Sequence, residues 1–438
     1  MHARRAILPL ALVLAGSMWF YVQHVMIPHQ QVEAAKFDIP RGNLSDLYPR
    51  WLGARELLLH HRDPYSADVT REIQIGYYRR PLDLTRPHDP KDQQGFAYPV
   101  HVAFLLAPTV QLPFETVQIG FRWLLITLTA VSVLLWLRVL SWHLSCANIA
   151  ALIVLTIGSF QVLQGIKLQQ LSLLVSALIA VAVFCLVKDR LLLAGALLAL
   201  ATIKPQLVLL LAAWLLLWAI GDWRQRQRFA WSFGLSMAAL LAASEMLLPG
   251  WFGEFRTALV AYREYNDGAW SILDTLLSPG AGRMLSAVIL LTLAVLAWRI
   301  RAVDAHSTAF QFTTAFVLTL TVVVMPKAAP YNQILLAPGI FFLIQHSASL
   351  WTRNRLMRAT LLLAAAFLLW PWMAALGLTL ASLVLPAETV QQALALPLYT
   401  SLAIPIGVAA ALAIGATGVV TMAESPHRPS LHSTRDPR

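Results

Sequence analysis

The sequence predicts an all-α, polytopic integral membrane protein. Hydrophobic residues make up 58% of the 438 residues and charged residues only 13%, about half the roughly 25% of an average soluble domain. The mean hydropathy is +0.64, and long apolar runs recur from one end of the chain to the other. These observations exclude a disordered chain and argue against a soluble globular enzyme.

Twelve apolar runs are candidate membrane-spanning helices. A straight span needs about 20 apolar residues, and several runs are shorter, so their ends and their exact number stay open. The first run also admits a second interpretation, a cleaved signal peptide, although it is long for one and lacks a clear cleavage site. The runs cover residues 6–27, 117–140, 146–163, 168–187, 190–203, 205–221, 229–248, 283–300, 308–325, 331–346, 358–385 and 397–421.

One further apolar run, residues 100–112, differs from the others. It is bracketed by Pro99 and Pro113 and interrupted by Pro108. These prolines, and a length below that of a span, favour a re-entrant or interfacial segment. The chain is therefore expected to comprise a polytopic membrane domain (1–422), which includes a large first extracytoplasmic loop (28–98) and the re-entrant or interfacial segment (99–113), and a disordered cytoplasmic tail (423–438).

The basic residues indicate which side of the membrane each loop faces. Cytoplasmic loops carry an excess of Lys and Arg, and Arg4 and Arg5 precede the first run. If residues 100–112 do not cross, the clusters Arg224–Arg228 and Arg353–Arg358 both face the cytoplasm, and the cytoplasmic excess equals the whole net charge of +11. We therefore expect both termini in the cytoplasm and no nucleic-acid partner, because topology already explains the charge.

The outer segment 28–98 holds the candidate catalytic residue. Asp46 follows the first span, in Ser45-Asp46-Leu47-Tyr48. A carboxylate there can act as a general base at the membrane surface, or it can be a first-turn acid that interacts with a helix dipole. We expect that helix over about residues 45–60, with Ser45 as its cap.

Lys204 is the first candidate for binding an anion. It lies between two apolar runs, in Ile203-Lys204-Pro205-Gln206. A Lys near hydrocarbon costs about 2.5–3.5 kcal/mol, and Pro205 frees backbone groups because it breaks the helix. The side chain suits the phosphate of a lipid substrate, with snorkelling to the interface as the alternative.

Two other outer segments repeat the combination of Lys with Gln or Asn. Lys167 follows Gln164, and Lys327 precedes Tyr331 and Asn332. Three such ends on one face indicate an anionic headgroup and sugar hydroxyls. Tyr98 either binds substrate or belongs to the aromatic belt at the interface. The candidate substrate-binding residues are Tyr48, Tyr98, Gln164, Gln206, Tyr331 and Asn332.

Other common catalytic motifs do not occur in the sequence. It has no Gly-rich phosphate loop, no nucleophile elbow and no His-Glu-x-x-His motif, and Cys146 and Cys185 have no metal-type spacing. The sequence therefore shows no recognisable motif for a reaction driven by a nucleotide. We therefore expect an activated lipid-linked donor and a reaction that requires neither a metal nor another cofactor.

A series of short motifs follows the first span: Asp46-Leu47-Tyr48, Asp63-Pro64-Tyr65, Phe96-Ala97-Tyr98-Pro99, Leu105-Leu106-Ala107-Pro108, Gln164-Gly165, Ile203-Lys204-Pro205-Gln206, Pro330-Tyr331 and Leu335-Leu336-Ala337-Pro338. In this order the chain, over about residues 6–345, resembles glycosyltransferase family 87 of the glycosyltransferase-C superfamily. It departs from the family at Val100, where a second Pro often follows Tyr-Pro, and at residues 165–170, which replace a Gly-Gln-x-Asn-like stretch. Both departures affect the sugar and acceptor more than the fold.

The resemblance implies an enzyme of the bacterial cytoplasmic membrane with an extracytoplasmic active site. The chain is similar to polyprenyl-phosphate-mannose-dependent mannosyltransferases. This similarity implies transfer of a hexose from a lipid phosphate to a glycolipid or cell-wall acceptor. It also implies that Asp46 is the catalytic base. On this hypothesis Lys204, Lys327 and Lys167 bind the donor phosphate. A single displacement at the anomeric carbon would invert its configuration.

Two other classes of protein are alternatives. A lipid flippase or transporter explains many spans and outer lysines, but it predicts ionisable residues near the middle of the membrane. The chief in-span charges, Arg122 and Glu245, lie near predicted span ends. The other alternative is a non-catalytic polytopic assembly or envelope factor, which a donor-binding assay would separate from an enzyme.

Overall fold

The computed structural model describes residues 2–36, 45–83, 85–86, 89–265, 268, 270–326 and 329–424. In these residues the regular structure is helical and includes no strand, which confirms the all-α prediction. Six helices are long and apolar enough to cross a membrane, or seven if the bent pair α7 (Cys146–Ile157) and α8 (Phe160–Lys167) is one span. The chain is a multi-pass membrane protein.

The six long apolar segments coincide with predicted runs. The first is continuous through a π-helical turn at its middle, and the last begins with two short helices. They are α1 (His2–Phe20) with η1 (Tyr21–Met26) and α2 (Ile27–Lys36), α6 (Phe114–Val139), α12 (Trp223–Leu247), α15 (Pro279–Arg299), α19 (Arg355–Ala381), and α20 (Ala387–Gln392) with η4 (Leu396–Leu398) and α21 (Ala403–Glu424).

The remaining predicted runs form shorter helices. α9 (Leu171–Val187), α11 (Pro205–Gly221) and α16 (Thr308–Val324) have 17 residues each, about 26 Å against a hydrocarbon layer of roughly 30 Å. α10 (Leu191–Ala201) has 11 residues, and at about 16 Å it is too short to span alone. The run at 331–346 is divided between η3 (Pro330–Leu336) and α17 (Ala337–Gln345). The total of twelve spans therefore stays a prediction.

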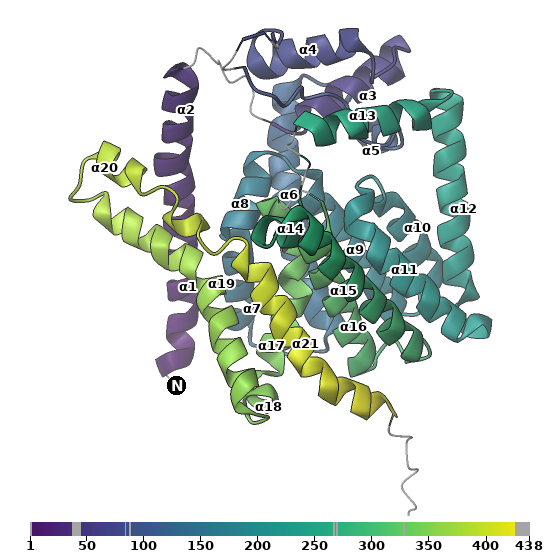
Figure 1. The fold of residues 1–438 in the computed structure, drawn as a ribbon, viewed down its shortest axis with the longest axis vertical. Coiled ribbons are helices and arrows are strands. Elements are labelled where there is room, and N and C mark those ends of the chain that lie inside the picture. The colour runs from purple at the N-terminus through teal and green to yellow at the C-terminus, as the bar shows by residue number, and fades with distance from the viewer. Residues whose placement is uncertain are drawn as a thin grey trace, which may run out of the picture.

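A layer of short helices covers one end of the bundle (Figure 1). It comprises α3 (Tyr48–His60), α4 (Ala67–Tyr78), α5 (Val102–Leu106) and α13 (Trp251–Tyr265). α5 and the following η2 (Ala107–Thr109) come from the run expected to be re-entrant or interfacial, an assignment that stays a prediction. The start of α1 and the end of α21 lie at the opposite end. Residues 425–438 of the expected tail lie outside the described residues. The other short helices are α14 (Ile272–Leu276) and α18 (Ser347–Trp351).

The first helix of this outer layer begins later than predicted. α3 starts at Tyr48, and its N-cap is Leu47, which makes no side-chain capping bond. Ser45 is fully buried, and its Oγ accepts a hydrogen bond from the Leu47 N–H at 3.3 Å. Ser45 thus stabilises a turn before the helix. Asp46 lies in this turn, and its N–H donates to the Leu168 carbonyl at 2.9 Å, so the segment between α8 and α9 fixes its position.

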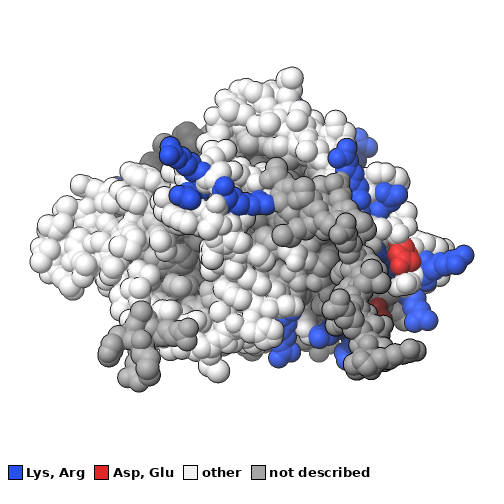
Figure 2. All heavy atoms as spheres, turned by 90° about the horizontal axis from the view of Figure 1, so that it is seen from below, with Lys and Arg blue, Asp and Glu red and all other residues white. Residues whose placement is uncertain are grey.

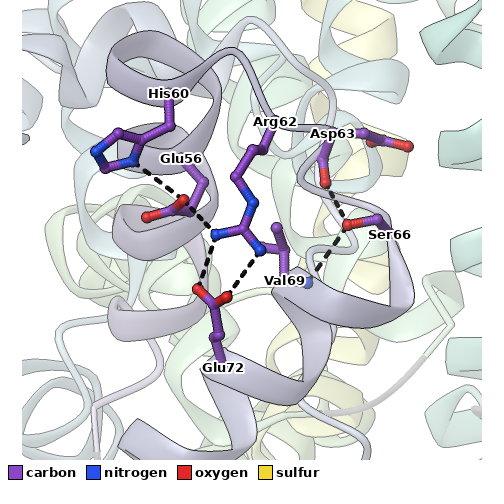
Figure 3. A network of polar contacts seen from close by, with 7 residues as sticks. All are labelled: Glu56, His60, Arg62, Asp63, Ser66, Val69 and Glu72. Atoms are coloured by element: carbon purple, nitrogen blue, oxygen red, sulfur yellow. Dashed lines mark hydrogen bonds and ion pairs between the residues drawn. The ribbon is translucent and has the colours of Figure 1, made fainter.

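An ion-pair network fixes the corner between α3 and α4 (Figure 3). Arg62 donates to Glu56 of α3 and to Glu72 of α4, at 2.7 Å in each case. His60 lies 3.1 Å from the same Glu56 carboxylate. Because Glu56 is largely buried, Arg62 compensates its charge and holds the two helices together.

A capped turn continues this corner. The Asp63-Pro64-Tyr65 motif lies in a turn, and Ser66 after it caps α4, since its Oγ accepts from the Val69 N–H at 3.4 Å. The Tyr65 hydroxyl donates to the Tyr98 carbonyl at 2.6 Å. The corner therefore supports the segment that carries Tyr98.

The opposite end of the molecule displays Lys and Arg side chains and few acidic ones (Figure 2). One of the predicted cytoplasmic arginines, Arg226 of α12, is buried instead of exposed. Its guanidinium lies 4.2 Å from the Trp218 ring and donates to the carbonyls of Trp218 and Val303, each at 2.9 Å. Arg226 thus joins α11 and α12 to the segment between α15 and α16.

Candidate active site

A polar cavity of about 360 Å³ lies where the outer layer meets the bundle. Its walls come from the start of α3, the segment before α5, the N-terminal ends of α9 and α11, one side of α13, and η3. The lining residues include Asp46, Arg50, Asp92, Tyr98, Gln170, Lys204, Gln206, Tyr262, Arg263, Tyr265, Tyr331 and Asn332. Six segments far apart in the sequence thus converge on one site.

Asp46 contributes a carboxylate to this cavity. Its Oδ2 accepts a hydrogen bond from the Gln170 side-chain amide, and its Oδ1 lies 3.4 Å from the Tyr77 hydroxyl. Burial raises the pKa of the Asp46 carboxyl above its ordinary value, although the nearby Arg50 and Lys204 cations oppose this shift. A raised pKa brings a carboxylate closer to the range in which it is an effective general base.

Lys204 contributes a buried ammonium at the start of α11. Only 7% of the residue is exposed. Its Nζ donates to Ser172 Oγ at 2.6 Å and lies 3.4 Å from Gln170 Oε1 and 3.5 Å from Asn332 Oδ1. It also lies 5.0 Å from the centre of the Tyr331 ring. A preorganised ammonium is suited to stabilise an anionic group.

Arg50 is a second cation in the cavity. One turn after Asp46, it donates from Nη1 to the Asp46 carbonyl at 2.8 Å, and its guanidinium lies 4.7 Å from the centre of the Tyr98 ring. Its buried Nε has no hydrogen-bond partner within the described part of the chain. Arg50 therefore holds the backbone of the candidate base and adds positive charge beside it.

The helix α13 contributes a partly aromatic wall to the same cavity. Phe255, Leu259, Tyr262, Arg263 and Tyr265 of this helix line it, while Phe252 and Val260 are more than half exposed. One face of α13 thus lines the cavity, while apolar side chains on the helix remain exposed, as in an amphipathic interfacial helix.

The predicted site residues fall into two groups. Asp46, Lys204, Tyr98, Gln206, Tyr331 and Asn332 line the cavity. Lys167, Gln164 and Tyr48 do not: Lys167 Nζ donates to Gln30 of α2 at 3.1 Å, and Tyr48 packs against Trp51 and Phe114. These three side chains leave their backbone in other directions, which sequence order alone does not indicate. Lys327 lies outside the described residues.

Arg50 and Gln170 were not predicted as site residues. The four-residue spacing from Asp46 to Arg50 is a usable signal, since positions one helical turn apart share a face. Gln170 carries no charge, and only the fold brings it to Asp46. Within the part of the chain that the structure describes, no group of three or more His, Cys, Asp or Glu side chains is placed to hold a metal ion.

A second cavity, of about 210 Å³, lies on the other side of η3 and is mainly apolar. Gln333, Ile334 and Leu336 line it, whereas Tyr331 and Asn332 line the polar cavity. Helices α7, α8, α17 and α19 supply most of its other residues. η3 therefore separates a polar space from an apolar one.

The fold is that of a polytopic membrane protein, with a polar cavity where the outer layer meets the bundle. The sequence model of glycosyltransferase family 87 matches residues 96–326, more than half of the chain. The chain belongs to this family, as the resemblance indicated, and is thus a glycosyltransferase. The matched range contains Tyr98, Gln170 and Lys204 and begins after Asp46. Comparisons with curated proteins and with solved structures gave no match.

Proposed function

We propose that this glycosyltransferase moves a hexose, with mannose as the first candidate, from a polyprenyl-phosphate donor to an extracytoplasmic acceptor hydroxyl, with inversion. The observation that carries the proposal is that one cavity holds both the Asp46 carboxylate and the Lys204 ammonium. The first suits proton removal from an acceptor, and the second suits a departing phosphate. Membership of a glycosyltransferase family favours this reaction over the flippase or transporter alternative.

The reaction is a single displacement at the anomeric carbon of the donor sugar. Asp46 takes the proton of the acceptor hydroxyl while its oxygen forms the new bond to that carbon. The bond from the anomeric carbon to the phosphate oxygen breaks, and the polyprenyl phosphate leaves with the electron pair. Because attack and departure occur on opposite faces of the sugar ring, the configuration inverts.

Lys204 stabilises the charge that develops on the leaving phosphate. Its Nζ donates to Ser172 and lies near Gln170 and Asn332, which fix the position of the ammonium in the cavity wall. In a site of low dielectric such a fixed charge acts more strongly than in water. Lys327 is the second predicted phosphate-binding residue, and we propose that it assists Lys204.

The sugar and the acceptor are bound by polar and aromatic side chains of the same cavity. Tyr98, Gln206, Tyr331 and Asn332 offer hydroxyl and amide groups, the partners that sugar hydroxyls need. We propose a glycolipid or a cell-wall polymer as acceptor. A lipid-linked donor agrees with a cavity that opens where the outer layer meets membrane helices.

The proposed location is the bacterial cytoplasmic membrane, with twelve spans of glycosyltransferase-C type, both termini in the cytoplasm and the cavity outside. The distribution of charge supports this orientation, because the end opposite the cavity layer displays Lys and Arg (Figure 2) and cytoplasmic loops are enriched in these residues. Cysteine-labelling of single loops from outside intact cells tests it.

The decisive experiment is transfer from radiolabelled polyprenyl-phosphate-mannose by the purified protein. We expect Asp46→Asn to reduce transfer by about 10²- to 10⁴-fold, the usual contribution of a general base. The matched control is Asp68→Asn, an exposed aspartate in the first turn of α4, which should transfer normally. Normal turnover by Asp46→Asn would remove Asp46 as the base, and a product with retained configuration would exclude the single displacement.

A further inference from the structure

Hydrogen bonds within the loop between α8 and α9 fix the backbone position of Gln170. Gln170 is 4% exposed, and its N–H donates to the Gly165 carbonyl at 2.8 Å. The preceding Gln169 has a positive φ of 48° and donates from its side-chain amide to the Ile166 and Lys167 carbonyls. The backbone that carries Gln170 is therefore fixed by hydrogen bonds before any substrate arrives.

Gln170 contacts a cation on one side and a carboxylate on the other. Its Nε2 donates to Asp46 Oδ2, and its Oε1 lies 3.4 Å from Lys204 Nζ. These two contacts fix the orientation of the amide. A flipped amide would point its NH₂ group at the ammonium and its oxygen at the carboxylate, and both contacts would become repulsive.

The same contacts extend into a chain of polar side chains across the cavity. Lys204 donates to Ser172 Oγ, and the Ser172 hydroxyl donates to Asn332 Oδ1 at 2.7 Å. The chain thus runs from η3 through α9 and the start of α11 to the turn before α3. Gln170 is the link that joins the phosphate-binding side of the proposed site to its base.

We propose that Gln170 is a positioning residue that holds the Asp46 carboxylate in its reactive orientation and joins it to Lys204. This inference rests on the proposed function, in which Asp46 is the base. The hydrogen bond to Oδ2 restricts rotation of the carboxylate. It therefore fixes how the carboxylate is presented to the acceptor hydroxyl.

A hydrogen bond donated to a carboxylate favours its charged form. Gln170 thus lowers the pKa of Asp46 and opposes the rise that burial causes. Removing the donor should therefore raise the pKa of Asp46. The other titratable groups around Asp46 are Arg50 of α3, Tyr77 of α4, Asp92 and Tyr98 before α5, Lys204 before α11 and Tyr331 of η3, and none of them changes in this experiment.

The test replaces Gln170 by Met, which keeps an unbranched side chain of similar size but cannot donate. The matched control is Gln311→Met: Gln311 of α16 is also buried, and it donates to the His306 carbonyl, away from the cavity. The pKa of Asp46 is read from its carboxyl infrared band, as the difference between each protein and its Asp46→Asn counterpart. The pH profile of mannosyl transfer and the donor KM are measured in parallel.

We expect Gln170→Met to raise the Asp46 pKa and to move the acid limb of the pH profile to higher pH by the same amount. Gln170→Glu should move both further, because a second carboxylate beside Asp46 disfavours its charged form. A uniform loss of rate with an unmoved pKa would overturn the inference. Since the infrared titration does not depend on turnover, normal transfer by Asp46→Asn would refute the proposed base separately.

Discussion

Replacing Lys204 by Met separates its contribution to function from its contribution to stability. In the folded protein the ammonium donates to Ser172 Oγ at 2.6 Å and lies 3.4 Å from Gln170 Oε1 and 3.5 Å from Asn332 Oδ1. One hydrogen bond that involves a charged group contributes about 1.5–3 kcal/mol. Placing an ammonium near hydrocarbon costs about 2.5–3.5 kcal/mol. These two values largely offset each other, so Lys204→Met should change the free energy of unfolding by no more than about 2 kcal/mol.

The effect on donor use should be much larger. If Lys204 binds the donor phosphate, its loss removes about 1.5–3 kcal/mol, which is about 10- to 150-fold in kcat/KM for the donor. The assay is the transfer rate as a function of donor concentration, with thermal unfolding of the detergent-purified protein measured on the same samples. Lys188→Met, an exposed Lys between α9 and α10, is the control. A large drop in melting temperature with unchanged donor dependence would show that Lys204 is a structural cation.

Two further predictions concern stability. Gly53→Ala should destabilise the protein by about 1–3 kcal/mol, because the new Cβ would lie 2.3 Å from the buried Phe96 ring. Gly120→Ala in α6 has open space around the new Cβ and should leave the stability unchanged. The melting temperatures of the two variants test both expectations. Arg80 holds the pKa of Asp89 down, at about 2 instead of 3.8. Since the folded pKa is the lower one, this pair stabilises the fold above about pH 4 and stops doing so as the pH falls towards 2. Acid unfolding of Asp89→Asn should lack this component, and an unchanged pH dependence would contradict the assignment.

Hydropathy predicted the membrane helices well because lipid imposes a strong constraint on sequence. A backbone in hydrocarbon must satisfy its own hydrogen bonds, so every apolar run became helical. Length was harder to predict. α10 is only 11 residues long, and it packs against α9 and α12.

The site was predicted in part. The charged residues Asp46 and Lys204 stand out because charge is rare in such a sequence, and both line the cavity. Gln170 and Arg50 do not stand out, since one is neutral and the other lies in a segment rich in charge. Lys167 shows the converse error of reasoning from composition: it has the expected neighbours, but its side chain reaches Gln30 of α2. Direction from the backbone, which the fold determines, decides such cases.

Arg226 shows that one basic residue can both indicate the membrane topology and stabilise the packing of the helices. As a basic residue it counts towards the cytoplasmic excess, yet in the structure its guanidinium is buried against Trp218 and backbone carbonyls.

The division made by η3 has a consequence for how this segment can vary. Along η3, Tyr331 and Asn332 line the polar cavity, whereas Gln333 and Ile334 line the apolar one. A substitution in η3 changes one wall at a time. Inserting a single residue would instead rotate the residues after it by about a third of a turn, and so turn their side chains away from the cavity that they line. The seven residues of η3 therefore behave as a unit of fixed length, whose register is as important as its composition.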